Sequence, residues 1–369
     1  MTTQVTKTLA EFDAELAQEH INGQWLYDRL LEQLIGGPRP AGVPYLWRWD
    51  HIYARLVEAC DVLPESFTAR RNLAFVNPGL QRGTTHTITM GMQMLKPGEI
   101  AWAHRHSMAA IRFALQGGAG LASVVDGEVC PMEDYDLVLT PRWTWHDHEN
   151  ETDTHPVWLD VLDLGLVMSL NAAFYEPYGE ERQPKRPGDG EYLQARAGHL
   201  RPTWERPKLD HVPHRYPWRE VEAELMRLAD QPGSPYDGVA LEYANPMTGG
   251  PTLPTMSCWI QRLRPGQVTE PHRHTSSSVY CVVRGEGSTV VGGEELQWGR
   301  HDAFCVPNWS MHHFVNRSAT DDAVLFSVND VPALRALGLY FEEPERSLHQ
   351  QDPPAVPGNL RPPRTTQRS

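Results

Sequence analysis

Two stretches of this chain repeat each other: residues 95–117 read LKPGEIAWAHRHSMAAIRFALQG, and residues 263–285 read LRPGQVTEPHRHTSSSVYCVVRG. The two blocks align without a gap and share Pro-Gly, His-Arg-His and the closing Gly. Self-similarity at a fixed spacing is typical of a duplicated structural unit. The chain therefore carries two copies of one unit.

The repeat continues downstream of both blocks. Residues 141–150, PRWTWHDHEN, match residues 307–316, PNWSMHHFVN, through Pro-x-Trp, a His and an Asn. Between the motifs lie VVDGEV (124–129) and VVGGEEL (290–296), whose Asp-Gly and Gly-Gly pairs predict β-hairpin turns. Short strands bounded by Gly, Pro and Asn predict a closed or sandwiched antiparallel barrel in each copy.

The flanks of the repeat have a different pattern. Helical spacing appears in residues 8–35, 51–60 and 217–230, the last of which begins with Pro and early acids. The predicted organisation is an N-terminal helical segment and arm (1–87), a first barrel (88–168), a linker with a helix (169–240), a second barrel (241–335) and a partly disordered C-terminal tail (336–369).

Composition narrows the class of protein. The chain has 369 residues, a formal net charge of −14 and 40% hydrophobic residues, so nucleic acid and anionic membranes are unsuitable partners. It has no apolar run of membrane-spanning length and no signal-peptide core, which predicts a cytoplasmic protein. The cysteines form no CxxC pair and are expected to be reduced and mostly buried: Cys60, Cys130, Cys258, Cys281 and Cys305.

The histidines of the repeat point to a metal. Residues i and i+2 of a strand face the same side, so His104 and His106 project together, and His146 can join them inside the barrel. Three imidazoles leave other coordination positions open, as a catalytic site requires. The second copy carries the same set, which is a second candidate metal site: His272, His274 and His312.

The spacing resembles the two cupin motifs, and their duplication resembles a bicupin. The motifs are Gly98-x5-His104-x-His106 and Pro141-x4-His146-x3-Asn150. The implied fold is mainly β, with two double-stranded β-helix (jelly-roll) barrels plus N-terminal and linking helices. Most metal-binding cupins have a Glu shortly after His-x-His, and neither copy has one. Three neutral ligands leave the metal dipositive, so it should attract an anionic, bidentate ligand.

Several longer motifs are similar to one family within the bicupins. HRHSMAAIRF, WTWHDH, WLDVLD, RRNLAFVNPGL (70–80) and YANPMTGG (243–250) resemble gentisate 1,2-dioxygenase and the related salicylate and 1-hydroxy-2-naphthoate dioxygenases. The resemblance implies an Fe(II) enzyme, a homotetramer by analogy, that uses O2 to open the gentisate ring between its carboxyl- and hydroxyl-bearing carbons, giving maleylpyruvate. WTWHDH is more similar to the gentisate enzymes, and salicylate and 1-hydroxy-2-naphthoate are the alternative substrates.

The resemblance also implies roles for individual residues. His104, His106 and His146 match the iron ligands. Arg112 matches the arginine that binds the substrate carboxylate, for which a planar guanidinium is suited.

Three further positions belong to the implied substrate pocket. Arg70 aligns with a second arginine near the substrate, although a slip of one residue would put Arg71 there. Gln93 aligns with a pocket residue. The family's aromatic residue at the position of Thr89 is absent here, which leaves the shape of that wall open.

Proton transfer is assigned to the strand that follows the second motif. His148 lies two residues beyond His146 and so on the same face, where it can act as acid or base. Asp160 is a carboxylate in an otherwise apolar strand, and burial is costly unless it is paired. We expect Asp160 to orient His148 or to meet a substrate hydroxyl, and Asp163 to be structural.

The second copy keeps its histidines and changes their surroundings. Mapped through the repeat, Arg112 becomes Tyr280, His148 becomes Phe314, and Asp160 falls on Phe326. We therefore expect the second barrel not to turn over substrate, whether or not its histidines hold an ion. His313, next to His312, should face outward.

Two other classes are weaker alternatives. Non-catalytic, ligand-binding bicupins usually lose the metal histidines, which this chain keeps in both halves. A manganese bicupin decarboxylase would need the missing Glu.

Overall fold

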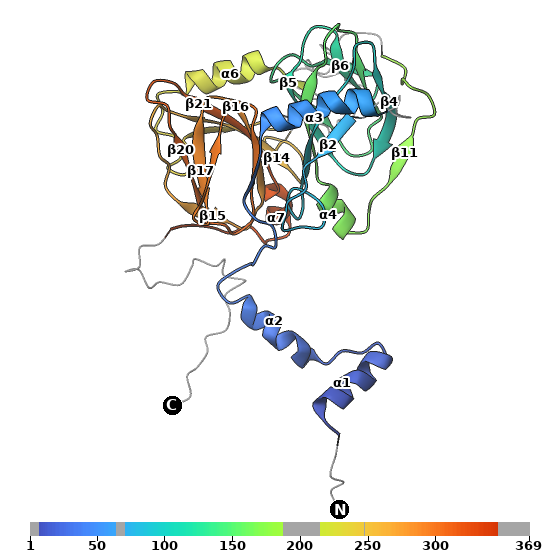
Figure 1. Ribbon diagram of the computed structural model, residues 1–369, viewed down its shortest axis with the longest axis vertical. Helices are drawn as coiled ribbons and strands as arrows, with labels where there is room; N and C mark the ends of the chain where they lie inside the picture. Colours follow the sequence, from blue (N-terminus) through green and yellow to red (C-terminus); the bar gives the residue numbers. More distant parts are fainter. Residues whose placement is uncertain (1–6, 64–70, 187–214, 247, 346–369) are drawn as a thin grey trace, which may run out of the picture. The chain divides into compact units, whose positions relative to one another are not determined.

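The computed structural model describes residues 7–63, 71–186, 215–246 and 248–345 (Figure 1). Arg70, residues 187–214 of the predicted linker and the tail beyond residue 345 lie outside the described residues. The chain divides into two units, up to Pro40 and from Ala41 onward. The described elements of the first unit are α1 (Leu9–Gln18), which begins with a capping box between Thr8 and Glu11, η1 (Gln24–Tyr27) and α2 (Asp28–Gln33).

The second unit contains two barrels, each built from two antiparallel sheets. In the first barrel the strand orders are β12-β8-β5-β10-β3-β2 and β11-β4-β9-β6-β7. Its strands are β2 (Arg71–Ala74), β3 (Thr89–Met94), β4 (Ile100–His106), β5 (Ala110–Gln116), β6 (Leu121–Val125), β7 (Glu128–Pro131), β8 (Leu137–Thr140), β9 (His146–Asn150), β10 (Val157–Leu162), β11 (Tyr175–Pro177) and β12 (Arg215–Tyr216).

The second barrel repeats this architecture, with strand orders β1-β19-β16-β21-β14-β13 and β18-β17-β20-β15-β22. The mainly β, two-barrel fold predicted from the repeat is confirmed. Its strands are β1 (Tyr45–Trp47), β13 (Val239–Glu242), β14 (Ser257–Leu263), β15 (His272–His274), β16 (Ser278–Arg284), β17 (Gly287–Val291), β18 (Glu294–Trp298), β19 (Ala303–Val306), β20 (His312–Asn316), β21 (Ala323–Asn329) and β22 (Glu342–Pro344).

The barrels exchange edge strands. β1 precedes the first barrel in sequence but pairs with β19 of the second, and β12 precedes the second barrel but pairs with β8 of the first. β11 and β22 also lie outside the predicted barrel ranges, and each pairs with a strand that carries a His-x-His motif. Each added strand covers an edge that would otherwise expose unpaired backbone groups.

The exchange extends to the helix that follows each edge strand. Asp302 of the second barrel accepts hydrogen bonds from the Trp49 amide at the start of α3 (Trp49–Val62) and from Arg48. Asp136 of the first barrel likewise accepts from the Trp218 amide at the start of α6 (Trp218–Arg227). A carboxylate at a helix N-terminus satisfies a free N–H and complements the helix dipole. The shorter helices α4 (Leu164–Ser169) and α7 (Val331–Ala336) follow β10 and β21.

The two barrels share one apolar core. The outer faces of β3, β5 and β10 pack against those of β14, β16 and β21 in one continuous buried cluster. Phe113 and Phe326 are both fully buried and stack across this interface, with ring centroids 4.0 Å apart. Each barrel interior forms a separate cluster. The shared core therefore fixes the barrels against each other and leaves their interiors for the histidines.

The five cysteines are free and buried, as the sequence predicts. Among the described residues, no helix is long and apolar enough to cross a membrane.

Candidate metal centre and active site

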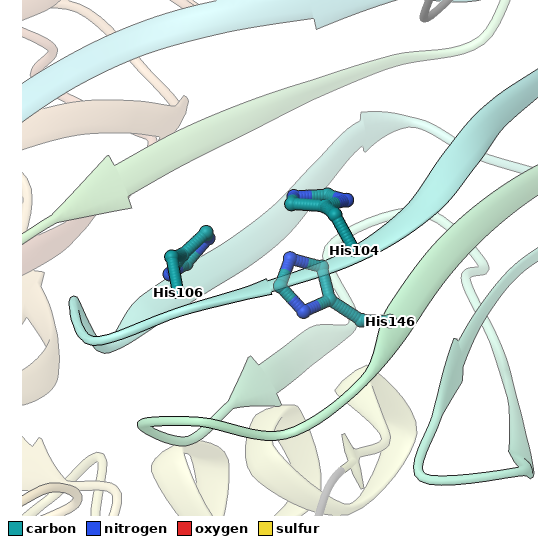
Figure 2. Close-up of side chains that lie close together, drawn as sticks. All are labelled: His104, His106 and His146. Atoms are coloured by element: carbon teal, nitrogen blue, oxygen red, sulfur yellow. The ribbon is translucent and has the colours of Figure 1, made fainter. Parts of the chain in front are cut away.

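Three histidines converge inside the first barrel (Figure 2). His104 and His106 come from β4, and His146, which lies opposite His104, comes from β9. The ring centroids are 4.1 Å apart for His104 and His146, and 4.8 Å apart for His106 and His146. One ligand atom from each side chain lies within 4.8 Å of the others, and all three residues are buried.

The orientation of the imidazoles suits a metal ion. Each Nδ1 lies within hydrogen-bond distance of a backbone carbonyl, which can only accept, so Nδ1 carries the proton and Nε2 can bind a metal. The buried Nε2 of His146 has no hydrogen-bond partner among the described residues. The Nδ1–O distances are 2.8 Å from His104 to Trp102, 2.8 Å from His106 to Met108 and 3.0 Å from His146 to Thr144.

Electrostatics favour the metal-binding form of His146. Burial lowers its pKa well below the usual value, and the neighbouring His104 and His106 lower it further, as do Arg112 and His148. The ring is therefore neutral at physiological pH, which is the state that binds a metal. His146 can therefore bind a divalent ion without first losing a proton.

Arg112 and Asp160 form a buried pair on neighbouring strands. They lie opposite each other on β5 and β10, with Nε of Arg112 3.2 Å from Oδ1 of Asp160. Arg112 also donates to Thr140 Oγ1 (2.8 Å), and Asn72 donates to Asp160 Oδ2 (2.6 Å). This pairing was not foreseen from the sequence, because it depends on the register of β5 against β10. A role for Asp160 towards His148 or a substrate hydroxyl stays a prediction.

His148 occupies the same strand as His146, two residues further on. Its ring centroid lies 6.0 Å from that of His146 and 5.3 Å from that of Trp158. Its Nδ1 is 2.7 Å from the hydroxyl of Ser123, and both residues are buried. The hydrogen bond holds the imidazole in one orientation beside the triad.

β3 provides a third wall on the same face. Gln93 lies opposite Trp158 on β10 and opposite Asn72 on β2, while Gly91 lies opposite Asp160. Gln93 is 3% exposed, and its Nε2 has no partner among the described residues. A buried amide without a partner is costly, so a ligand or a water is expected there. Asn72 is the site residue that sequence reasoning missed: it lies within the quoted motif 70–80, but its contact with Asp160 depends on how β2, β3 and β10 align.

Arg71 does not face this pocket. It lies opposite Met94, which belongs to the core between the barrels, and donates to Glu99. Successive residues of a strand face opposite sides, so Arg71 and Asn72 project away from each other. The predicted role of the neighbouring Arg70 lies outside the described residues.

The second barrel holds an equivalent triad. His272 and His274 on β15 and His312 on β20 have ligand atoms within 4.8 Å of one another. Nδ1 of His274 and of His312 bonds to the carbonyls of Ser276 (2.8 Å) and Ser310 (2.9 Å), and Nε2 of His312 has no partner among the described residues. Burial lowers the pKa of His272 to about 3, so this ring too is neutral. His313, expected to face outward, is partly exposed.

The surroundings of the second triad differ from those of the first. The sequence correctly predicts the residues that replace Arg112 and His148, but not the one that replaces Asp160. Tyr280 stands where the first barrel has Arg112 and stacks on Phe304 at 4.8 Å. Phe314 stands where the first barrel has His148, 5.8 Å from His312 between ring centroids.

The third position requires a correction. Asp160 pairs with Arg112, and the residue that pairs with Tyr280 is Ser327, so Ser327 and not Phe326 is the counterpart of Asp160. The second copy has one extra residue before its last strand. A shift of one residue reverses the face, and Phe326 accordingly points into the core between the barrels.

Comparison with known proteins agrees with this architecture. The cupin domain model matches residues 91–162 and 259–329. The chain is 49% identical to 1-hydroxy-2-naphthoate 1,2-dioxygenase of Nocardioides sp. (strain KP7), covering 95% of this chain and 91% of the relative. It is 42% identical to 5-aminosalicylate 1,2-dioxygenase of Comamonas sp., covering 89% and 88%.

A solved structure matches over nearly the whole chain. This is salicylate 1,2-dioxygenase from Pseudoaminobacter salicylatoxidans in its adduct with gentisate, with a TM-score of 0.83 and 30% identity over 94% of this chain and 96% of that one. Both the sequence and the fold are thus shared end to end. The chain therefore belongs to the bicupin family of ring-cleaving 1,2-dioxygenases that includes the gentisate, salicylate and 1-hydroxy-2-naphthoate enzymes.

Proposed function

We propose that the enzyme uses Fe(II) at the first triad to open the ring of an aromatic acid with a hydroxyl next to its carboxylate. The observation that carries this proposal is the placement of a buried arginine, Arg112, beside three buried histidines whose ligand atoms converge. Fe(II) held by His104, His106 and His146 supplies open coordination positions for a chelating substrate and for O2.

Arg112 binds the substrate carboxylate in this proposal. Its guanidinium is fixed by Asp160 and Thr140 before any substrate arrives. A donor held in place by packing loses little entropy when it binds its ligand. Asp160 therefore contributes by orienting Arg112, in addition to balancing its charge inside the barrel.

His148 transfers the proton of the substrate hydroxyl. Ser123 holds one ring nitrogen, Nδ1, and the buried imidazole lies beside the ring of His146. A group that holds or releases one proton at this position assists both binding of the phenolate and opening of the ring. Gln93, with its amide unsatisfied by described residues, adds a hydrogen bond to the substrate.

Gentisate is the substrate that the sequence motifs favour, and 1-hydroxy-2-naphthoate is a second candidate. Two observations support the bicyclic acid: the 49% identity to a 1-hydroxy-2-naphthoate enzyme, and the small side chain of Thr89 on the face of β3 that carries Gln93. A threonine fills less space there than the family's aromatic residue would. We therefore expect kcat/KM for the bicyclic acid to equal or exceed that for gentisate.

Oxygen uptake by the Fe(II)-loaded protein tests both levels of the proposal. Gentisate, salicylate, 5-aminosalicylate and 1-hydroxy-2-naphthoate are compared under the same conditions. Thr89→Phe should reduce kcat/KM for the naphthoate more than for gentisate, because the added ring fills the space. If none of the four acids consumed O2 at full iron loading, the proposed function would be wrong.

The second triad is proposed to bind a divalent ion without turning over substrate. Its three ligand atoms converge within 4.8 Å of one another, as those of the first triad do. Glu342 lies opposite His274 on β22, and the phenol of Tyr280 replaces the guanidinium of Arg112. An acidic residue at this triad attracts a cation and repels an anionic aromatic acid.

We further propose that the enzyme is a cytoplasmic homotetramer, as the family resemblance implies. Light scattering coupled to size-exclusion chromatography measures the assembly directly.

A further inference from the structure

The loop after each His-x-His motif positions one metal ligand. In the first barrel this loop is 107–109, and the carbonyl of Met108 accepts the hydrogen bond from Nδ1 of His106. Arg142 donates to the carbonyl of Ser107 (2.6 Å). The amide of Ala109 donates to Oδ1 of Asp163 (3.0 Å). Both ends of the loop are thus fixed by side chains from outside it.

A threonine of the second barrel completes this arrangement. Thr255 lies just before β14, and its hydroxyl is 2.5 Å from Oδ2 of Asp163. The Thr255 hydroxyl oxygen accepts a hydrogen bond from Nη2 of Arg142 (2.8 Å), and Arg142 also pairs with Asp163. Asp163 is fully buried. One hydroxyl therefore joins the two side chains that fix the ligand loop of the opposite barrel.

The converse arrangement exists in the second barrel. The ligand loop there is 275–277, where the carbonyl of Ser276 accepts from Nδ1 of His274. The amide of Ser277 donates to Oδ1 of Asp330 (2.8 Å), and the hydroxyl of Thr87, a residue of the first barrel, donates to Oδ2 of Asp330 (2.5 Å). Thr87 and Thr255 occupy equivalent positions of the repeat. The same threonine–aspartate contact therefore occurs in both directions between the barrels.

We propose that Thr255 and Thr87 are positioning residues, each of which orients a metal-ligating histidine of the other barrel. Thr255 acts on His106 through Asp163 and loop 107–109. Thr87 acts on His274 through Asp330 and loop 275–277. The inference uses the proposed function only in treating the first triad as the reacting site.

The two contacts are not equally strong. In the first barrel, Arg142 adds a charged donor that binds both Asp163 and the loop. The equivalent position of the second barrel is Asn308. Hydrogen bonds to charged groups are stronger than neutral ones. Loop 107–109, which positions His106, is therefore held more firmly than loop 275–277.

The test uses the full-length protein with three substitutions: Thr255→Val, which keeps the shape and removes the hydroxyl, Thr255→Ser, which keeps the hydroxyl, and Thr87→Val as the matched control. Co(II) is loaded into each, and its release to a chelator is followed without substrate. To observe the first triad alone, all three are made in a background of His272→Ala with His274→Ala.

In that background, Thr255→Val should accelerate Co(II) release about tenfold, the lower end of what loss of an outer-shell contact costs a metal site. It should also change the visible absorption of Co(II), which reports ligand geometry. Thr255→Ser should restore both, and Thr87→Val should leave the release rate at the first triad unchanged. With Fe(II), Thr255→Val should lower kcat more than it raises KM.

Wild-type release and absorption in Thr255→Val would overturn the proposal, as would an equal acceleration in Thr255→Ser or Thr87→Val. If the valine variant does not fold, Thr255→Cys replaces it, since a thiol is a weak donor of similar size, and it should release Co(II) at an intermediate rate. Wild-type release from that variant would count equally against the proposal. These readouts need no substrate, so a failure of the proposed function leaves them interpretable.

Discussion

The two barrels hold nearly identical histidine triads in opposite chemical surroundings. In both, a His-x-His strand faces a third histidine, and a backbone carbonyl accepts from Nδ1 of that third histidine and of the second histidine of the motif. Beside the first triad stand a buried ion pair and an imidazole, whereas Tyr280 and Phe314 stand beside the second. The comparison teaches that a metal site and a substrate site are separable. The first depends on backbone geometry, which the fold preserves, and the second on a few side chains, which can change independently.

The difference has a physical cost on each side. Burying Arg112 with Asp160 requires desolvation of two charges, which is compensated only by their pairing and by Asn72 and Thr140. The second barrel avoids that cost: Tyr280 stacks on Phe304 at 4.8 Å between ring centroids, a favourable aromatic contact. We infer that the first barrel retains the costly pair because it binds substrate there.

The largest expected effect is the loss of a ligand from the first triad. His104→Ala or His146→Ala should abolish both turnover and iron binding at that triad while the fold persists, because the shared core is formed by the other sheet of the barrel and contains no residue of β4 or β9. The paired variant His272→Ala with His274→Ala should lower the iron stoichiometry and leave turnover per first-triad iron near wild type. Iron analysis and oxygen uptake measure both. If the paired variant lost turnover as completely as His104→Ala, the second triad would be needed for the reaction.

The second-largest expected effect is that of replacing His148, the proposed acid or base. His148→Gln should lower kcat by roughly 10²- to 10⁴-fold, the usual contribution of general acid–base catalysis, and flatten the corresponding limb of the pH–rate profile. Phe314→Leu is the matched change in the second barrel and should leave the profile unaltered. An unchanged pH profile in the glutamine variant would remove His148 from proton transfer.

Loss of Arg112, the residue proposed to bind the substrate carboxylate, should have a smaller effect. Arg112→Ala is expected to raise KM by roughly 10- to 100-fold, since a hydrogen bond to a charged group is worth about 1.5–3 kcal/mol. Iron content should stay near wild type. Tyr280→Phe, the matched change, should not affect KM. If Arg112→Ala lost its iron but bound residual substrate normally, the assignment would be wrong.

The smallest effect tests the contact where the barrels meet. His301 and Tyr135 hold equivalent positions of the repeat, and the Tyr135 hydroxyl lies 3.0 Å from Nε2 of His301. Burial and the nearby Arg300 lower the pKa of His301 to about 4. In the unfolded chain the value is about 6.5. The stabilisation from neutral His301 is therefore complete above pH 6.5 and declines as the pH falls towards 4.

His301→Asn should accordingly lose less thermal stability than wild type between pH 7 and pH 5. Asparagine tolerates the positive φ of 66° at this position better than most residues. Thermal melts of both proteins at the two pH values measure the difference. An identical loss of Tm in both would show that His301 does not contribute to the pH dependence.

The amino-acid sequence by itself determined the barrels, both triads and the position of Arg112 and His148, because these are local features. A His-x-His on a strand puts two rings on one face whatever surrounds it, and a duplicated motif reports a duplicated barrel. The same reasoning identified Tyr280 and Phe314 as replacements, since the repeat runs without gaps from Gly98 to Arg112 and again through the second motif.

Only the tertiary structure decided which residues meet across strands and across barrels. Pairing of Arg112 with Asp160, the contribution of Asn72 and the replacement of Asp160 by Ser327 depend on strand register, and one extra residue reverses the face. The exchange of β1 and β12 and the contacts of Thr255 and Thr87 join residues far apart in sequence. Such contacts leave no local pattern, because the free energy that selects them comes from packing one barrel against the other.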